Sequence, residues 1–458
     1  MDDGLDFSDR HILPMASDSS LSSRHVTVVG AALTGATMAI YLARRGHSVE
    51  LYEMRPDIRE ADVTEGRSIN LALSTRGLHA LESIGLADAA RELCIPMHGR
   101  MIHSPEGDLS FQPYGQEGQH INSVSRSDLT ELLVEAADRR PNIDLAFRRK
   151  CVDVDLDNPA VTLEDLDEGG HQTVETDLVV GADGAYSAVR ESLGDTDGFR
   201  EEQSYLDHGY KELRIPPADD GDWRFDPHAL HIWPRHDFMF IALPNPDGSF
   251  TGTVFLPYEG ETSFESLEGS GRVREFFEQQ FGDLIGHLPD LEEQFEDNPT
   301  SPLVTIRCEP FHYDGSVLLA GDAAHAIVPF YGQGMNASFE DCFIFDDLLD
   351  KFDDDFDRAL PAFSQRRKPD ADAIAELALY NYVEMRSKVA EENFLLRKRL
   401  ERTLQKAFPR AWQPLYSMVT FSTMPYAEAK DRAEQQEKLM DALLPESVLN
   451  VIGRVINP

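Results

Sequence analysis

A glycine-containing turn near the N-terminus has the spacing of a nucleotide-binding loop. GAALTG, from Gly30 to Gly35, follows a short apolar run and precedes a helical pattern. Gly30 permits a tight turn, and Gly35 lets helix and strand pack closely, so that a pyrophosphate can rest on the helix N-terminus. Glu53 ends the next apolar run, where a carboxylate can bind a ribose hydroxyl. Ala32 replaces the usual second glycine. The order strand, turn, helix, strand and acid predicts a dinucleotide site, and the acid favours FAD or NAD over NADP.

A second glycine-rich loop lies late in the chain. LAGDAAHAIVPFYGQGMN, from Leu319 to Asn336, suggests a buried strand, a turn at Gly321 and Asp322, and a helix that begins at about Asn336. Backbone N–H groups at such a helix start attract anions or carbonyl oxygens. An ordinary loop between strand and helix is the alternative. His325 has apolar neighbours, which favours a hydrogen-bonded structural role.

The segments between and after these loops must position them. An apolar strand over 177–180 ends in the turn GADGAYSAVR, and a helix over 129–137 has Ser127 as a candidate N-cap. From about 205 to 305, short alternating runs separated by Gly, Pro and Asp predict an antiparallel sheet that can wall a pocket. The helix that opens at Gly271 follows no strand, so a second dinucleotide fold is not expected. Helical patterns continue over 360–385, 388–407 and 427–443.

The charge of the chain disfavours several kinds of partner. The formal net charge of the 458 residues is -40 at pH 7, which argues against nucleic acids and anionic membranes. Acidic residues are spread along the chain. We hypothesise that they adapt the surface to a salt-rich cytoplasm, where screening suppresses self-repulsion. A solvated acidic surface without that role is the alternative.

Sequence features near the N-terminus and among the cysteines predict a cytoplasmic protein. The start, MDDGLDFSDR, is acidic and polar, unlike a signal peptide, and no apolar run is long enough to predict a membrane span. The four cysteines are widely spaced, form no CxxC pair and suit core filling in a reducing compartment. His228 and His231 flank an apolar strand without a partnering carboxylate, so no metal site is expected.

Several longer motifs are shared with one enzyme family. A nucleotide turn, a DG turn in mid-chain and a late GD turn, with a single dinucleotide fold, resemble the group A flavoprotein aromatic hydroxylases, and within them the branch that hydroxylates kynurenine. The resemblance covers the chain from about 24 to 430. It rests on GRSINLALSTRG (66–77), QPYG (112–115), HGYKEL (208–213), LHIWP (230–234), IALPN (241–245), GDAAHAIVPFYGQGMN (321–336), YNYVEM (380–385) and YSMVTF (416–421).

The resemblance implies an α/β fold. A Rossmann-like FAD-binding domain, typical of group A flavin monooxygenases, would combine with an antiparallel-sheet substrate domain and a C-terminal helical region. A segment from about 95 to 125 would contact the substrate. The expected divisions are a disordered lead-in over 1–23, the FAD-binding domain over 24–204 and 306–355, the substrate domain over 205–305 and the helical region over 356–458.

The same resemblance implies an FAD-dependent NADPH monooxygenase. Bound FAD, reduced by NADPH, would react with dioxygen to give a flavin hydroperoxide that hydroxylates L-kynurenine to 3-hydroxy-L-kynurenine, a step of tryptophan degradation towards NAD or quinolinate. The pocket should be aromatic and apolar with few polar anchors, because the reaction must be shielded from water. The aniline nitrogen of the substrate activates the ring, so no acid or base is assigned. The chain resembles the soluble bacterial form, without a membrane anchor, and no oligomeric state is predicted.

Positions within the motifs carry expected roles. Arg100 and Tyr114 should bind the amino-acid carboxylate, because a guanidinium and a phenol hydroxyl suit it. Asn381, Tyr416 and Glu384 would complete this polar end. The remaining substrate contacts are expected at Ile232, Phe250 and Met385. The flavin-facing loop comprises Pro329, Phe330, Tyr331, Gly332 and Gln333. The expected FAD contacts are Gly30, Thr34, Gly35, Tyr52, Glu53, Met54, Arg55, Ala72, Arg126, Asp322, Gly334, Met335 and Asn336.

Two other functions are compatible with the sequence. One is a flavin hydroxylase of a different aromatic acid, although the polar cluster around Arg100 and Tyr416 suits an amino-acid end. The other is a flavoprotein-fold binding module without catalysis. Ala32 gives that alternative some support, whereas the intact late glycine-rich loop argues against it.

Overall fold

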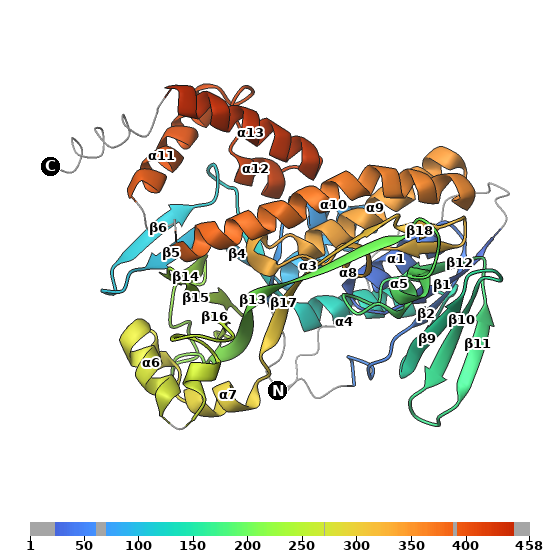
Figure 1. The fold of residues 1–458 in the computed structure, drawn as a ribbon, viewed down its shortest axis with the longest axis horizontal. Helices are drawn as coiled ribbons and strands as arrows, with labels where there is room; N and C mark the ends of the chain where they lie inside the picture. The colour runs from blue at the N-terminus through green and yellow to red at the C-terminus, as the bar shows by residue number, and fades with distance from the viewer. Residues whose placement is uncertain (1–22, 61–69, 270, 388–391, 444–458) are drawn as a thin grey trace.

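The computed structural model describes residues 23–60, 70–269, 271–387 and 392–443. The fold has two main parts. One is built on a mostly parallel sheet, and the other is built on a larger mixed sheet (Figure 1). Nearly all of the predicted lead-in, the first four residues of GRSINLALSTRG and the C-terminal end of the predicted helical region lie outside the described residues.

The parallel sheet holds the nucleotide turn. Its order is β18 (His312–Tyr313), β19 (Val317–Leu319), β12 (Leu178–Gly181), β1 (His25–Val29), β2 (Ser48–Tyr52) and β8 (Ile143–Ala146). All neighbours are parallel except the pair β18 and β19. The packed helices include α1 (Leu33–Arg44), α4 (Arg126–Asp138), α5 (Ala188–Leu193) and α9 (Gly334–Phe352). Ligands of such sheets bind beyond the carboxyl ends of the strands, where both glycine-rich loops lie.

The larger sheet has seven strands. Its order is β17 (Ser301–Glu309), β13 (Arg200–Ile215), β16 (Phe250–Pro257), β15 (Phe238–Pro244), β14 (Ala229–Arg235), β5 (Gly99–His103) and β6 (Leu109–Pro113). Only β14 and β5 run parallel. The segment around Arg100, predicted to contact the substrate, therefore joins this sheet as an added pair of strands. One face packs on a buried cluster with α6 (Arg272–Gln280) and α7 (Leu291–Asp297).

Smaller elements fill the remaining faces. One three-stranded sheet comprises β3 (Asn70–Leu73), β7 (Ile121–Ser125) and β4 (Ile95–Met97), and another comprises β9 (Arg149–Asp155), β10 (Ala160–Asp165) and β11 (His171–Glu175). The further helices are α2 (Thr75–Ser83), α3 (Ala87–Glu92), α8 (Asp322–His325), α10 (Phe356–Ser387), α11 (Glu392–Ala407), α12 (Leu415–Thr420) and α13 (Tyr426–Leu443). Short 3₁₀ turns lie at Glu265–Leu267, Ile285–His287 and Pro329–Tyr331. Figure 1 shows the long α10 crossing the middle of the molecule.

Two expected helix starts are corrected by the structure. Ser127 does not cap α4, because the Ser125 side chain accepts the hydrogen bond from the Asp128 backbone N–H and the helix begins at Arg126. α9 begins at Gly334, two residues before Asn336. α9 thus starts within the late glycine-rich loop, earlier than the sequence pattern suggested.

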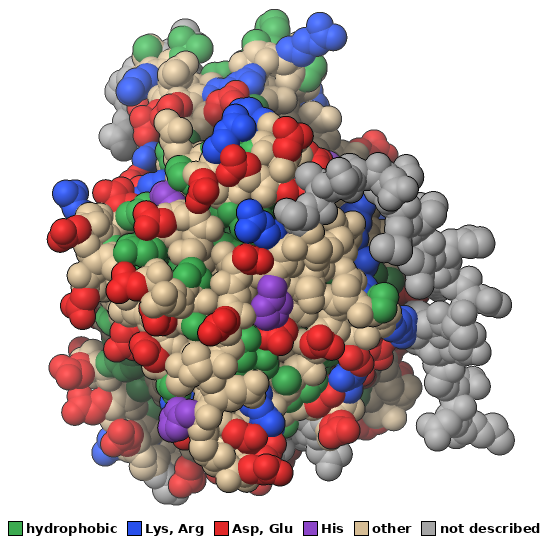
Figure 2. Space-filling view, turned by 90° about the vertical axis from the view of Figure 1, so that its right-hand side faces the viewer, with side chains coloured by type: hydrophobic (Ala, Val, Ile, Leu, Met, Phe, Trp, Pro, Cys, Tyr) green, Lys and Arg blue, Asp and Glu red, His purple; other side chains and the backbone are tan. Residues whose placement is uncertain are grey.

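The surface and the cysteines agree with the composition. Acidic side chains are scattered over the whole face seen in Figure 2, with fewer basic ones among them. Cys94, Cys151, Cys308 and Cys342 form no disulfide, and all but Cys94 are buried, which confirms the prediction of core filling. Within the described ranges, no helix is both long and apolar enough to cross a bilayer.

Candidate active site

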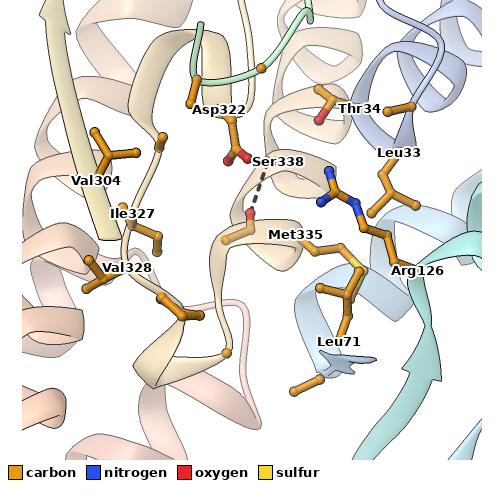
Figure 3. Close-up of a pocket in the computed structure, with 18 of the residues that line it drawn as sticks. Leu33, Thr34, Leu71, Arg126, Val304, Asp322, Ile327, Val328, Met335 and Ser338 are labelled. Atoms are coloured by element: carbon orange, nitrogen blue, oxygen red, sulfur yellow. Dashed lines mark hydrogen bonds between the residues drawn. The ribbon is translucent and has the colours of Figure 1, made fainter. Parts of the chain in front are cut away.

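One continuous cavity of about 440 Å³ joins the two glycine-rich loops to the predicted polar anchors. Its walls come from the nucleotide turn, the cavity-facing strands of the seven-stranded sheet, the 3₁₀ turn Pro329–Tyr331 and the start of α9. Figure 3 shows Arg126 extending into it near Leu33 and Met335. The predicted residues that line the cavity are Gly30, Thr34, Tyr52, Glu53, Met54, Arg55, Ala72, Arg100, Tyr114, Arg126, Asp322, Pro329, Phe330, Tyr331, Gly332, Gly334, Met335, Met385 and Tyr416.

The nucleotide turn has little room for side chains. Gly30 has a φ of 97°, and a Cβ there would lie 2.5 Å from the Ala182 carbonyl oxygen. A Cβ at Gly35 would lie 1.7 Å from the Gly30 carbonyl oxygen, so the close packing inferred from the sequence requires glycine at both positions. Ala32 immediately precedes α1 and lines the cavity.

Glu53 holds this turn in place. Its two carboxylate oxygens accept hydrogen bonds from the Ala31 and Arg55 backbone N–H groups, each at 3.0 Å. The side chain is almost buried and lines the cavity. A carboxylate oxygen can accept more than one hydrogen bond, so Glu53 can position the turn and still receive a ribose hydroxyl.

A buried ion network supports the late loop. The Gly321 backbone N–H donates to Asp341 at 2.8 Å, and the His325 Nε2 lies 2.6 Å from the same carboxylate oxygen. Arg367 Nε donates to the other Asp341 oxygen at 2.7 Å. His325 is therefore scaffolding, as its apolar neighbours predicted. The network fixes the start of α8, so that Asp322 faces the cavity.

Two polar residues that were predicted near the flavin, Gln333 and Asn336, do not line the cavity. Asn336 Nδ2 donates to the Ala72 and Gly332 carbonyl oxygens at 2.8 Å, and its Oδ1 accepts the Ser74 backbone N–H at 2.9 Å. Gln333 Oε1 accepts a hydrogen bond from the Tyr426 hydroxyl at 2.9 Å. These buried amides tie the loop to β3 and α13, and they leave backbone groups to face a ligand.

The polar end of the cavity is built around a buried guanidinium. Arg100 Nη1 lies 3.5 Å from Glu384 Oε1, and the Arg100 Cζ lies 5.7 Å and 5.3 Å from the ring centroids of Tyr114 and Tyr416. The two tyrosine rings stack at 5.1 Å. Burial raises the pKa of Tyr416 to about 12 and that of Tyr114 well above its usual value. Both phenols are therefore neutral hydrogen-bond donors at pH 7.

Two buried polar atoms at this end have no partner. Among the described residues, neither the Arg100 Nε nor the Tyr114 hydroxyl has a hydrogen-bond partner. Buried donors without a partner are costly and are seldom left so in a native protein. Because both residues line the same cavity, a ligand with acceptor oxygens would satisfy them.

The aromatic wall is positioned by Asn381. Its Nδ2 donates to the Phe330 carbonyl oxygen at 2.6 Å, and the Phe330 ring stacks on Tyr382 at 4.1 Å. Phe330 also contacts the ring of Phe255 at 5.0 Å. Asn381 and Glu384 do not line the cavity themselves. Asn381 thus acts on the loop, and Glu384 lies against Arg100, which does line the cavity.

Strand alternation decides which side chains of the sheet reach the cavity. Phe250 belongs to the cluster on the α6 side, where its ring meets Phe225 and His231 at 5.6 Å. The expectation that Phe250 forms the pocket wall is not met, because residues with the opposite parity, including Phe255, face the cavity. Ile232 is on the cavity side of the sheet, beside its strand partner Ile241, but Ile241 and Leu230 line the cavity and Ile232 does not.

Several lining residues were missed by the sequence motifs. They are Leu230, Ile241, Leu243, Thr251, Thr253 and Phe255. Three of these lie within LHIWP and IALPN, on the same strand face as the predicted Ile232, so extending that face along β14 and β15 would have identified them. Asp183 of the DG turn also lines the cavity. Burial raises its pKa, although the Ser187 hydroxyl and two backbone N–H groups donate to it.

Arg190 connects the DG turn to the late loop. Its guanidinium donates to the Ala323 carbonyl oxygen at 2.9 Å and to the Ala185 carbonyl oxygen at 2.7 Å. It also lies 3.1 Å from Glu201. The buried Arg190 side chain therefore links the DG turn in mid-chain directly to the late GD turn.

The cavity fits an FAD molecule in the chemistry of its walls. The starts of α1 and α9 open into it, and Arg126 offers a cation. A Cβ at Gly332 would lie 3.0 Å from the Ala72 side chain, so the glycine there keeps this space open. Helix N-termini and arginine bind phosphates, and a backbone without side chains admits a flat ring.

Comparison with known proteins agrees with this geometry. The family described as FAD binding domain matches residues 23–376. A kynurenine 3-monooxygenase of Myxococcus xanthus is 47% identical over 92% of this chain and 90% of that protein. The kynurenine 3-monooxygenase of Sus scrofa is 45% identical over 93% of this chain and 90% of that protein.

Solved structures extend the likeness to the fold. The tetrameric form of 2-methyl-3-hydroxypyridine-5-carboxylic acid oxygenase matches with a TM-score of 0.67 at 22% identity, over 81% of this chain and 94% of that one. PqsL of P. aeruginosa, in complex with 2-aminobenzoylacetate, matches with a TM-score of 0.63 at 20% identity, over 80% and 97%. The chain belongs to the FAD-binding monooxygenases, and within them to the kynurenine 3-monooxygenase family.

Proposed function

We propose that the protein hydroxylates L-kynurenine to 3-hydroxy-L-kynurenine with NADPH and dioxygen. The observation that carries the proposal is the pair of unpartnered buried donors, Arg100 Nε and the Tyr114 hydroxyl, in the cavity that also contains the nucleotide turn. A carboxylate would satisfy both donors. Relatives at 41–47% identity carry the name of this activity.

The ion pair between Arg100 and Glu384 suits a zwitterionic amino acid. The two side chains are almost buried and 3.5 Å apart, longer than a hydrogen bond. The substrate carboxylate would bind Arg100 with Tyr114, and the ammonium group would lie towards Glu384. A ligand without the amino group would offer Glu384 no ammonium group to pair with. This favours an amino acid over a simple aromatic acid as substrate.

FAD would lie between the nucleotide turn and the late loop. Glu53, Arg126 and Asp322 are the side chains placed to hold it, with the backbone of Gly334 and Met335 at its ring end. When bound and reduced by NADPH, FAD supplies the activated oxygen that is transferred to the substrate.

The protein's own part is to orient the ring and exclude water. Phe255, Phe330, Ile241, Leu243 and Met385 form an apolar wall around the space beyond Arg100. Asn381 fixes Phe330 through its carbonyl oxygen. No side chain is assigned as acid or base. The wall and the single anchored end together hold the aromatic ring in one orientation.

A direct assay tests the proposed function. The purified protein should carry an oxidised-flavin spectrum, oxidise NADPH faster when L-kynurenine is added in air, and form 3-hydroxykynurenine. Stimulation by a phenolic acid but not by L-kynurenine would indicate a hydroxylase of another aromatic acid. A colourless protein that cannot be reconstituted with FAD would indicate a binding module.

A further inference from the structure

The long strand β13 carries a carboxyl group on the cavity side of the sheet. Gly209, Lys211 and Leu213 are buried on the other face, where Lys211 donates to the Phe295 carbonyl oxygen at 2.6 Å. By alternation, Tyr210 and Glu212 lie on the cavity face. Tyr210 lines the cavity, and so does Thr253, the residue paired with Glu212 across the sheet.

The Glu212 carboxyl group has no hydrogen-bond partner in the part of the chain that the structure describes. Its backbone oxygen accepts the Asn298 amide, but its side chain receives no donor. Burial raises the pKa of Glu212 to about 7, even though the nearby Arg126 opposes the shift. No hydrogen-bond donor among the described residues therefore stabilises the ionised form of Glu212 on this face of the sheet.

Arg126 is the charged group that acts on Glu212, through its charge and without an ion pair between the two described side chains. It is the first residue of α4 and its guanidinium reaches into the cavity between Leu33 and Met335 (Figure 3). The neighbouring titratable groups are phenols. Tyr210 lies beside Glu212 on β13, and Tyr186 lies at the mouth of the cavity; burial raises the pKa of both, so they stay neutral near pH 7.

We propose that Glu212 competes with FAD for Arg126, so that the protein binds FAD more tightly when Glu212 is protonated and takes up a proton on binding. This proposal rests on the assignment of the cavity to FAD. The ionised carboxylate attracts the guanidinium and adds a negative charge to a site that must receive a pyrophosphate. The neutral carboxyl group does neither. FAD affinity therefore falls as pH rises through about 7, the pKa of Glu212.

Titration of FAD-free protein with FAD, followed by flavin fluorescence from pH 6 to pH 9, tests this. The wild-type Kd should rise about tenfold, the change produced by a one-unit difference in the Glu212 pKa between the two states. Glu212→Gln should bind tightly with little change over the same range. Glu202→Gln is the matched control, because Glu202 is an exposed residue of the same strand, and it should follow the wild type.

Proton uptake gives a second measurement that needs no variant. Mixing the FAD-free wild-type protein with FAD at pH 7 in weak buffer containing an indicator dye should remove protons from solution, and Glu212→Gln should remove none. No uptake by the wild type, or an equal pH slope in Glu212→Gln, would overturn the proposal. A protein that binds no FAD at any pH would instead refute the assignment of the cavity.

Discussion

Arg100 Nη1 lies 3.5 Å from Glu384 Oε1, and both side chains are at most 11% exposed. The positive charge of Arg100 is balanced by the carboxylate of Glu384. The stacked rings of Tyr114 and Tyr416 lie beside the Arg100 guanidinium at the cavity. In the proposed function this pair would receive the two opposite charges of an amino-acid substrate. It would thereby distinguish such a substrate from a plain aromatic acid, and the first two predictions test this role.

Arg100→Ala should raise the KM for L-kynurenine roughly 10- to 150-fold, because removing a charged hydrogen-bond partner costs about 1.5–3 kcal/mol. Bound FAD should be unaffected. Steady-state kinetics with the flavin spectrum of each preparation measure both effects. Arg91→Ala serves as the control, since Arg91 is an exposed arginine paired with Asp88. A KM like that of the wild type would remove Arg100 from the substrate site.

Glu384→Gln should weaken L-kynurenine binding while changing the binding of an analogue without the α-amino group much less. The reason is that only the natural substrate presents an ammonium group to this carboxylate. Binding can be followed by the perturbation of the flavin spectrum. Equal losses for the two ligands would show that Glu384 supports Arg100 alone and does not meet the substrate.

Tyr416→Phe should raise the KM for L-kynurenine roughly two- to tenfold, the effect of losing one hydrogen bond worth about 0.5–1.5 kcal/mol. The phenylalanine ring keeps the stacking on Tyr114 and Tyr331 at 5.1 Å and 5.7 Å, so the thermal unfolding midpoint should not move. Unaltered kinetics would exclude the Tyr416 hydroxyl from the site.

The Asp341 network should control both stability and its pH dependence. Although burial opposes ionisation, His325 and Arg367 lower the pKa of Asp341 to about 2. Its contribution is therefore present above the unfolded value of 3.8 and lost as pH falls through about 2. Burial also disfavours the charge on His325, yet Asp341 raises the pKa of His325. That contribution is present below pH 6.5 and is lost as pH rises through the higher folded value.

Asp341→Asn should lower the free energy of unfolding by about 3–5 kcal/mol at pH 7, because Arg367 and His325 would stay buried without their carboxylate. Urea unfolding measures the loss. Asp347→Asn on the same helix is the control: its pair with Arg366 is about half exposed, and such pairs contribute about 0–1 kcal/mol. A similar small effect at Asp341 would contradict the role of this network.

Local sequence predicted the parts of the site that depend on local backbone geometry. The turn at Gly30 and Gly35 follows from steric limits within six residues, and the structure shows those limits directly. The wall residues depend on which face of a strand meets the cavity. Both faces of β16 are largely buried, so its pattern of alternation could not distinguish Phe250 from Phe255.

Contacts between residues far apart in the sequence could not be predicted from local sequence patterns either. Asn381 was expected at the substrate, but it reaches a carbonyl oxygen 51 positions earlier in the chain. The links from Asp341 to His325 and Arg367 join three different helices. Hydrogen bonds of this kind depend on helix packing, which composition and spacing do not determine.

Stability should increase with salt if the acidic surface is adapted to it. Raising KCl from 0.1 M to 1 M shortens the screening length from about 10 Å to about 3 Å, which weakens repulsion among the 82 acidic residues. The same screening weakens attractions such as those of Arg45 with Asp346 and Asp350. We expect repulsion to dominate, because the net charge is -40, so the unfolding midpoint should rise across a KCl series. A sucrose series at matched osmolality controls for general solute effects, and equal midpoints at low and high KCl would reject the adaptation.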